Sequence, residues 1–295
     1  MNLVFHQAAL GDFALILPLL RGLEGSTTVV TPWSRGRLAS ALIPGVSAMD
    51  IELFEFTRLH RDPGPRTLSP AVAELFDAAR VVITFIGDGE DTWAENMVRL
   101  APQANLVWLP TRPGGLWDAG TTHAADFHRE TLMSHGVAVA EAEVAESGRA
   151  DGPIVVHPGS GGESKCWPRE RFAALVEALR DRKLPVRVVY GEAEAERWPA
   201  EELERWHAEF DARGCATLEQ LVELLADARR FVGNDAGPTQ LAAQLGVPTT
   251  ALFGPTEPTA WAPRGPAVDV IAPDEPCPMD WLEVDRLLSR LGVDA

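Results

Sequence analysis

Short apolar runs alternate with stretches of helical spacing along most of the chain. Runs such as 3–5 predict buried strands, whereas Leu15, Leu19 and Leu23 share one face of a helix. The predicted strands are 3–5, 27–31, 80–85, 106–109, 154–157, 186–190, 231–232, 249–253 and 268–271. The predicted helices are 13–23, 34–42, 71–79, 92–100, 123–135, 169–182, 192–210 with an interruption at Pro199, 218–226, 239–245 and 281–291. This alternation predicts parallel sheets with crossover helices, so the fold class is α/β.

The alternation stops once and then restarts, which predicts two domains. Residues 137–152 lack aromatic anchors and lead into Gly152-Pro153, a composition typical of a linker. We expect an open α/β domain over 1–140, a linker over 141–152 and a second α/β domain over 153–278, followed by a terminal segment, 279–295. Residues 44–70 show no clear pattern of their own.

Composition excludes several classes of function. The net charge of −17 argues against a nucleic-acid partner, because a phosphate backbone binds basic surfaces. No apolar run approaches the roughly 18 residues of a membrane span, and the first residues lack the basic region of a signal peptide. Three distant cysteines fit a reducing cytoplasm, and no histidine pair has metal-binding spacing. We therefore expect a cytoplasmic protein without a metal.

The stretch from 230 to 265 carries the strongest functional signal. It reads as strand, turn, helix, strand and turn, with Gly246 and Pro248 closing the helix. Ligands of parallel sheets bind outside the carboxyl ends of the strands, where both turns lie. The helix N-terminus after the first turn is suited to bind a phosphate. Asp235, in that turn, either faces such a ligand or caps the helix.

Two further turns could carry chemistry. In the glycine-rich turn 159–165, small residues let the backbone approach a phosphate that Lys165 could neutralise. Ser164 and Cys166 break the P-loop pattern, so a P-loop nucleotide hydrolase is excluded. The alternative is a plain loop with a solvated lysine. Asp12, before an apolar helix, either caps that helix or acts as a general base at an interdomain cleft.

Together the three turns suggest group transfer. Asp12 lies in the first predicted domain, and Lys165 and Asp235 lie in the second. A base on one domain and a phosphate clamp on the other suit transfer from a nucleotide-activated donor. Asp12 would deprotonate an acceptor hydroxyl, while Lys165 and the helix N-terminus would stabilise the departing diphosphate, where charge develops.

These motifs resemble those of family 9 glycosyltransferases, the bacterial ADP-heptose:lipopolysaccharide heptosyltransferases. Leu10-Gly11-Asp12 is similar to the family's N-terminal loop. His157-Pro158-Gly159-Ser160, followed by Lys165-x-Trp167-Pro168, is similar to its glycine-rich loop. The longest match is its donor signature, Val232-Gly233-Asn234-Asp235-x-Gly237-Pro238 and then Leu252-Phe253-Gly254-Pro255-Thr256.

The resemblance implies a GT-B architecture, two Rossmann-like doubly wound domains that face a cleft, and inverting sugar transfer without a metal. Asp12 would be the general base, and the final helix in 279–295 would pack back on the N-terminal domain. The donor-binding positions that it implies are Ser160, Gly161, Lys165, Glu194, Leu218, Asp235, Ala236, Gly237 and Gln240.

The chain departs from the family pattern D-[ST]-G-x-x-H at two positions. Ala236 replaces the hydroxyl residue and Gln240 replaces the histidine. A glutamine can donate a hydrogen bond to a phosphate but cannot carry a positive charge, so the donor sugar stays open. In the N-terminal half, four arginines either bind an anionic acceptor or are solvated surface residues. These are Arg35, Arg37, Arg58 and Arg61.

The sequence therefore predicts an enzyme, an inverting glycosyltransferase that moves a sugar from a nucleotide-diphosphate donor to a saccharide or glycolipid acceptor. The family implies heptose as the sugar and an ADP-sugar as the donor, with no cofactor, and a lipopolysaccharide-type acceptor. Any membrane contact would be peripheral, at the inner face. Two alternatives remain: an accessory protein that binds a nucleotide-sugar without transfer, and a GT-B epimerase that needs no acceptor.

Overall fold

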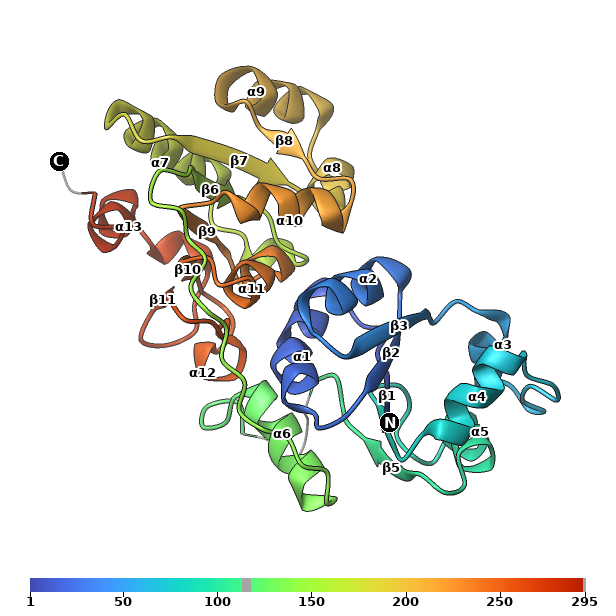
Figure 1. Ribbon diagram of the computed structural model, residues 1–295. Helices are drawn as coiled ribbons and strands as arrows, with labels where there is room; N and C mark the ends of the chain where they lie inside the picture. The colour runs from blue at the N-terminus through green and yellow to red at the C-terminus, as the bar shows by residue number, and fades with distance from the viewer. Residues whose placement is uncertain (113–117, 294–295) are drawn as a thin grey trace. The chain divides into compact units, whose positions relative to one another are not determined.

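The computed structural model describes residues 1–112 and 118–293, which form two compact units (Figure 1). Unit 1 comprises Met1–Asp118 and Ala124–Ala142, and unit 2 comprises Ala119–His123 and Glu143–Ala295. The short segment Ala119–His123 thus belongs to unit 2. The chain then returns to unit 1, where residues 124–134 form the last helix of that unit. His123 takes part in this attachment, because its Nε2 lies 2.8 Å from the backbone oxygen of Ala262.

Unit 1 is a five-stranded parallel sheet in the order β3-β2-β1-β4-β5, with helices on its faces. The strands are β1 (Asn2–Phe5), β2 (Thr27–Thr31), β3 (Val46–Asp50), β4 (Val81–Thr84) and β5 (Asn105–Trp108). The helices are α1 (Leu10–Gly22), α2 (Trp33–Leu42), α3 (Phe54–Thr57), the 3₁₀ turn η1 (Arg58–His60), α4 (Pro70–Ala78), α5 (Thr92–Leu100) and α6 (Ala124–Ser134). The chain reverses direction across the sheet between β1 and β4, which makes the end of β1 the switch point where ligands of such sheets bind.

Strand β3 lies in the stretch 44–70 that showed no pattern. It is an edge strand, with one buried residue followed by exposed and half-buried ones. An edge strand buries little apolar surface, so its hydrophobic signal is weak. The core beside β1 instead consists of large buried side chains such as Phe5, Phe56, Phe76 and Trp93.

Unit 2 is a six-stranded parallel sheet in the order β11-β10-β9-β6-β7-β8. Its strands are β6 (Ile154–His157), β7 (Val186–Tyr190), β8 (Arg213–Gly214), β9 (Arg230–Asn234), β10 (Thr249–Leu252) and β11 (Val268–Ile271). Its helices are η2 (Glu163–Lys165), α7 (Arg169–Asp181), α8 (Glu192–Arg197), α9 (Ala200–Phe210), α10 (Leu218–Ala226), α11 (Gly237–Gln244), α12 (Pro258–Trp261), η3 (Met279–Trp281) and α13 (Val284–Arg290). The switch point lies between β6 and β9.

Two local features of unit 2 differ from the sequence prediction, and a third matches it. The predicted interruption at Pro199 is confirmed: residues 192–210 form two helices, because Trp198 is extended and Pro199 precedes α9 without an N–H to continue α8. Strand β8 has only two residues, both exposed, and carries no apolar pattern. The final helix α13 packs against α7, and its Leu287 and Leu288 join the unit 2 core. It was expected to pack on the N-terminal domain.

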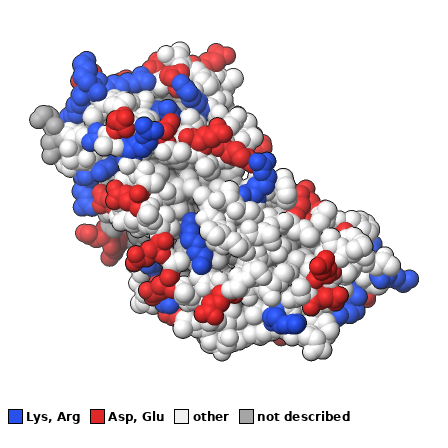
Figure 2. Space-filling model, in the orientation of Figure 1, with Lys and Arg blue, Asp and Glu red and all other residues white. Residues whose placement is uncertain are grey.

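The expected linker is bound along unit 2. The Ser147 amide donates to Gly246 O (2.9 Å), and the Arg149 amide donates to Ala228 O (3.0 Å). Gly246 closes α11 with a φ of +83°, and a Cβ there would lie 2.1 Å from Ala145 O, so this position requires glycine. None of the described helices is long and apolar enough to span a bilayer. On the face shown in Figure 2, basic and acidic side chains are interspersed.

Candidate functional site

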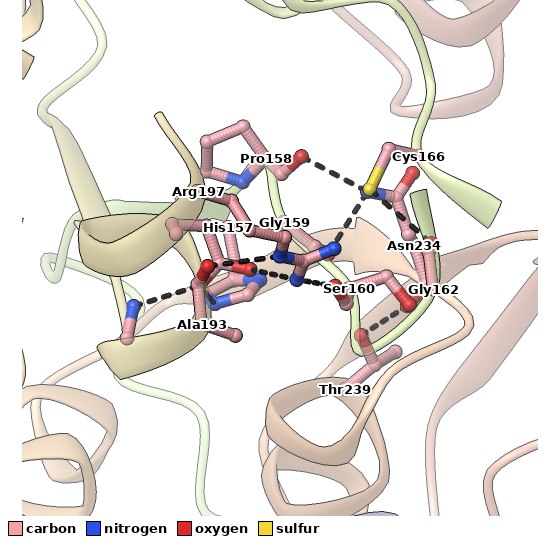
Figure 3. A network of polar contacts seen from close by, with 12 residues as sticks. His157, Pro158, Gly159, Ser160, Gly162, Cys166, Ala193, Arg197, Asn234 and Thr239 are labelled. Atoms are coloured by element: carbon pink, nitrogen blue, oxygen red, sulfur yellow. Dashed lines mark hydrogen bonds and ion pairs between the residues drawn. The ribbon is translucent and has the colours of Figure 1, made fainter. Parts of the chain in front are cut away.

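The best-defined polar site of unit 2 lies at the carboxyl ends of β6 and β9. Asn234, the last residue of β9, is fully buried. Its Nδ2 donates to Pro158 O (3.1 Å) and to Gly159 O (3.0 Å), and its Oδ1 accepts from the Trp167 amide (2.9 Å). This one side chain therefore fixes both ends of the glycine-rich loop to the neighbouring strand. Figure 3 shows Asn234 with Pro158 and Gly159 at the start of the loop.

Asp235 is the acidic centre of this site. Lys165 Nζ and Thr256 Oγ1 each lie 2.9 Å from its Oδ2. The Asp235 side chain is 9% exposed and that of Lys165 is 30% exposed, so the ion pair is partly shielded from water. The structure corrects two alternative interpretations from the sequence. Asp235 is not a helix cap, because the N-cap of α11 is Ala236. Lys165 is not simply a solvated lysine, because it forms an ion pair with Asp235.

Thr256 was not predicted as a site residue. It follows β10 and reaches Asp235 from a third loop. The Gly254-Pro255-Thr256 turn marked the position in the sequence, but the hydroxyl's partner lies 21 residues earlier in the chain. The three loops after β6, β9 and β10 thus meet at one carboxylate.

Several predicted donor-binding residues already have partners inside unit 2. Ser160 Oγ donates to the backbone oxygen of Asp235 (3.0 Å), and the residue is buried. Gln240 Nε2 donates to Trp261 O (2.6 Å) and is buried as well. Gly161 lies at the open part of the loop, since no atom lies within 4 Å of the Cβ that a larger residue would add. Contact of these residues with a donor stays a prediction.

The remaining donor positions lie at helix starts. Gly237 is the first residue of α11, an eight-residue helix with Ala236, 7% exposed, at its N-cap. Leu218 begins α10 after the N-cap Thr217 and is half-buried. Gly237 follows the carboxyl end of β9 and Leu218 follows that of β8, in the same sheet.

Glu194 is buried beneath the glycine-rich loop. Its Oε2 accepts from the Gly191 amide (2.9 Å) and lies 3.5 Å from His157 Nε2. Burial raises the pKa of this carboxyl, but the hydrogen bond and charge of His157 and the Gly191 amide outweigh it, so the net pKa lies below its ordinary value. A Cβ on Gly159 would lie 1.9 Å from Glu194 Oε1. The carboxylate therefore supports the loop, and its predicted contact with the donor stays untested.

In unit 1, Asp12 lies in the first turn of α1, after the carboxyl end of β1. The N-cap residue of α1 is Ala9, which corrects the interpretation of Asp12 as a cap. The Asp12 side chain is 14% exposed, and its Oδ1 lies 4.0 Å from Arg112 Nε. The position at the sheet's switch point fits a reactive carboxylate.

The four candidate acceptor arginines differ in their surroundings. Arg35 Nη1 donates to Ala8 O in the loop before Asp12. Burial lowers the pKa of Arg35, and the charge of Asp12 opposes that shift. Arg58 donates to Pro63 O (3.2 Å) and lies over the Phe54 ring. Arg37 and Arg61 are exposed. Arg35 is thus built into the loop that precedes Asp12.

His6 is a buried titratable group beside this loop. Its ring lies edge-on to Phe13 (5.5 Å between centroids) and Phe85 (5.2 Å). Neither ring nitrogen has a hydrogen-bond partner within the residues described. Burial lowers its pKa to about 3, and the charges of Arg35 and His128 act in the same direction. The imidazole is therefore neutral in the folded protein.

This neutral imidazole should make the protein sensitive to acid. The unfolded chain takes up the proton below pH 6.5 and the folded protein only near pH 3, so stability falls as pH decreases across this window. Between pH 6.5 and 5 the loss should be about 2 kcal/mol. Urea unfolding at pH 6.5 and at pH 5 measures the free energy of unfolding, and in His6→Phe the difference between the two pH values should be smaller by that amount. His135→Gln, at an exposed histidine, is the control, and an unchanged pH dependence in His6→Phe would rule His6 out as the linked group.

Known proteins with the same architecture were found by comparison of structures. E. coli heptosyltransferase WaaC with ADP aligns over 100% of this chain and 99% of its own, with a TM-score of 0.69 and 18% identity. E. coli ADP-heptose lps heptosyltransferase II aligns over 99% of this chain and 97% of its own, with a TM-score of 0.55 and 20% identity. Two doubly wound parallel sheets with this likeness define the GT-B glycosyltransferase fold.

Comparison of sequences gives the family. The profile of glycosyltransferase family 9 (heptosyltransferase) matches residues 121–288, more than half of the chain. The chain therefore belongs to glycosyltransferase family 9, as its motifs predicted. Lipopolysaccharide heptosyltransferase 3 of Escherichia coli K12 is 26% identical over 58% of this chain and 51% of its own length. Lipopolysaccharide heptosyltransferase 1 of Pseudomonas aeruginosa is 35% identical over 39% of this chain and 32% of its own.

These sequence matches centre on part of the molecule. The chain spans about half the length, or less, of the curated relatives that it matches.

Within residues 1–112 and 118–293, no group of three or more His, Cys, Asp or Glu side chains is arranged to hold a metal ion. The expectation of metal-independent chemistry stays a prediction.

Proposed function

We propose that the chain is an inverting, metal-independent glycosyltransferase that moves heptose from an ADP-activated donor to a saccharide or glycolipid acceptor. The observation that carries the proposal is the convergence of Lys165 and Thr256 on Asp235 at the switch point of unit 2. The family membership and the heptosyltransferase relatives support the choice of sugar and nucleotide.

Unit 2 would bind the donor. Asp235 Oδ2 is held by Lys165 and Thr256, so the carboxylate is oriented in advance, and its Oδ1 would accept from a donor sugar hydroxyl. The N-terminus of α11 and the open backbone around Gly161 would hold the diphosphate. Lys165 would stabilise the negative charge that develops as the nucleoside diphosphate leaves.

Unit 1 would bind the acceptor and supply the general base. Asp12 takes the proton of an acceptor hydroxyl, and that oxygen forms a bond to the anomeric carbon of the donor from the face opposite the diphosphate. The bond from this carbon to the diphosphate oxygen breaks, its electron pair leaves with ADP, and the anomeric configuration inverts. The reaction would take place in the cytoplasm, with at most a peripheral contact to the inner face of the membrane.

A second candidate is a protein that binds a nucleotide-sugar without transferring the sugar. It is favoured by the family departures, since Ala236 lacks a hydroxyl and the Gln240 amide is bonded to Trp261 O. Release of ADP that depends on an added glycan acceptor supports the transferase. Donor binding with no turnover on any acceptor extract supports the binding protein.

Nucleotide binding at Lys165 is the direct test of the donor site. Melting temperature should rise with ADP and less with UDP, GDP, CDP or dTDP. At a ligand concentration 100 times Kd the folded state gains about 2.7 kcal/mol. Lys165→Met should remove most of the shift, because it removes the charge at the diphosphate. The sequence has only one other lysine, so Lys183→Met is a matched control and should keep the shift. Equal shifts in both variants would contradict the assignment of Lys165.

A further inference from the structure

A second cation lies beside the glycine-rich loop. Arg197 is the last residue of α8. Its Nε donates to Ala193 O (2.9 Å), its Nη2 donates to Ser160 O, and Nη2 also lies 3.7 Å from Glu194 Oε1. Figure 3 shows its side chain between α8 and the glycine-rich loop. The arginine therefore donates a hydrogen bond to the backbone of the loop that we propose binds the diphosphate.

Arg197 contacts the loop from the β7 side, whereas Lys165, which belongs to the loop, pairs with a residue on the β9 side. The loop follows β6, which lies between β7 and β9 in the sheet. Arg197 extends from the helix after β7, whereas the partner of Lys165 is Asp235, directly after β9. Burial raises the pKa of Cys166, the residue after Lys165, and the charge of Arg197 opposes that shift. At Cys166 the charge of Arg197 thus acts against the charges of Glu194 and Glu163.

The charge balance of the site calls for more than one cation. A nucleoside diphosphate that leaves carries two to three negative charges, and Lys165 already shares its one positive charge with Asp235. Arginine has five N–H donors, arranged as a fork that suits phosphoryl oxygens. The contacts among the described residues use Nε and Nη2, and 38% of the side chain is exposed. None of these contacts uses the third guanidinium nitrogen, Nη1.

We propose that Arg197 is a second diphosphate-binding residue of the donor site, which holds the glycine-rich loop through Nη2 and a phosphoryl oxygen through Nη1. This inference rests on the proposed function, because it takes the donor to be a nucleoside diphosphate sugar. Glu194 positions the guanidinium from below, since it is buried and tied to the Gly191 amide. Arg197 contributes charge where the leaving group accumulates it.

Binding of ADP and of adenosine separates a phosphate contact from a general effect on the fold. Arg197→Gln should weaken ADP about 10- to 100-fold, the usual effect of losing a charged hydrogen bond, and leave adenosine unchanged. Arg197→Lys, which keeps the charge without the fork, should lose less. ADP affinity is measured by calorimetry, and adenosine binding by ligand-observed NMR.

The matched control is Arg205→Gln. Arg205 also pairs with a glutamate three residues earlier, Glu202 (2.7 Å), and its side chain is 43% exposed, but it lies on α9. Its ADP affinity should stay within about twofold of the parent chain, because the phosphate contact is absent.

Three outcomes would overturn the inference. If Arg197→Gln weakens adenosine as much as ADP, Arg197 only shapes the loop. If ADP affinity is unchanged while the parent chain binds ADP, the proposal for Arg197 fails and the proposed function stands. If the parent chain binds none of the five nucleoside diphosphates, the donor site itself fails and Arg197 with it.

Discussion

Asp12→Asn should lower the rate of sugar transfer by about 10²- to 10⁴-fold, the contribution of a general base. Asparagine keeps the shape of the side chain but cannot accept the acceptor's proton. Asp12 lies in unit 1, whereas the proposed diphosphate contacts lie in unit 2. The Kd for ADP should therefore stay within about threefold of the parent chain. Turnover is followed as ADP release from ADP-heptose in the presence of a lipopolysaccharide-core acceptor.

The control for this experiment is another aspartate at the start of a helix in unit 1. Asp91 is the N-cap of α5, and its Oδ1 accepts from the Ala94 amide (2.9 Å). Asp91→Asn should leave transfer unchanged and at most lower stability by a few tenths of a kcal/mol, because asparagine also caps helices well. If Asp12→Asn turns over as fast as Asp91→Asn, Asp12 is a first-turn carboxylate without a catalytic role, and another base must be sought.

The order of strands and helices was predictable because its signals are local. An apolar run, a glycine or proline turn and a helical repeat each lie within a dozen residues, as in 249–253 or 169–182. Both predicted elements appear in the structure, as β10 and α7. The prediction failed where burial is slight, at the edge strand β3 and at the two-residue β8. It also failed for the packing of α13, because the apolar face of an amphipathic helix shows that the helix is packed but not against which core.

The candidate site was predicted as a set of positions but not as a set of contacts. The motifs placed Lys165 and Asp235 at strand ends, yet their ion pair joins residues 70 apart in sequence. A polar residue in a loop is equally able to face a ligand or to hold the protein together. For Ser160 and Gln240 the structure shows internal hydrogen bonds, and for Arg197 it shows a contact with the loop that no motif indicated.

Asn234→Ala should have the largest effect on stability, about 3 kcal/mol or more of the free energy of unfolding, since three buried hydrogen bonds are lost at about 1 kcal/mol each. The Trp167 amide loses its acceptor at a fully buried residue, which adds a desolvation cost. Urea unfolding measures the loss, and hydrogen exchange of the Trp167 amide should accelerate with it. ADP affinity should fall as well, because the glycine-rich loop is no longer fixed to β9.

Two variants separate hydrogen bonding from the loss of volume. Asn234→Asp keeps the shape but replaces the amide that donates to Pro158 O and Gly159 O with an oxygen, so it should destabilise at least as much as alanine. Asn105→Ala removes one hydrogen bond at an exposed asparagine, to His135 O (2.8 Å), and should cost less than about 1 kcal/mol. A loss of that small size in Asn234→Ala would mean that water replaces its bonds. The glycine-rich loop would then be held by Glu194 and Arg197 from the β7 side, and ADP affinity would survive the substitution.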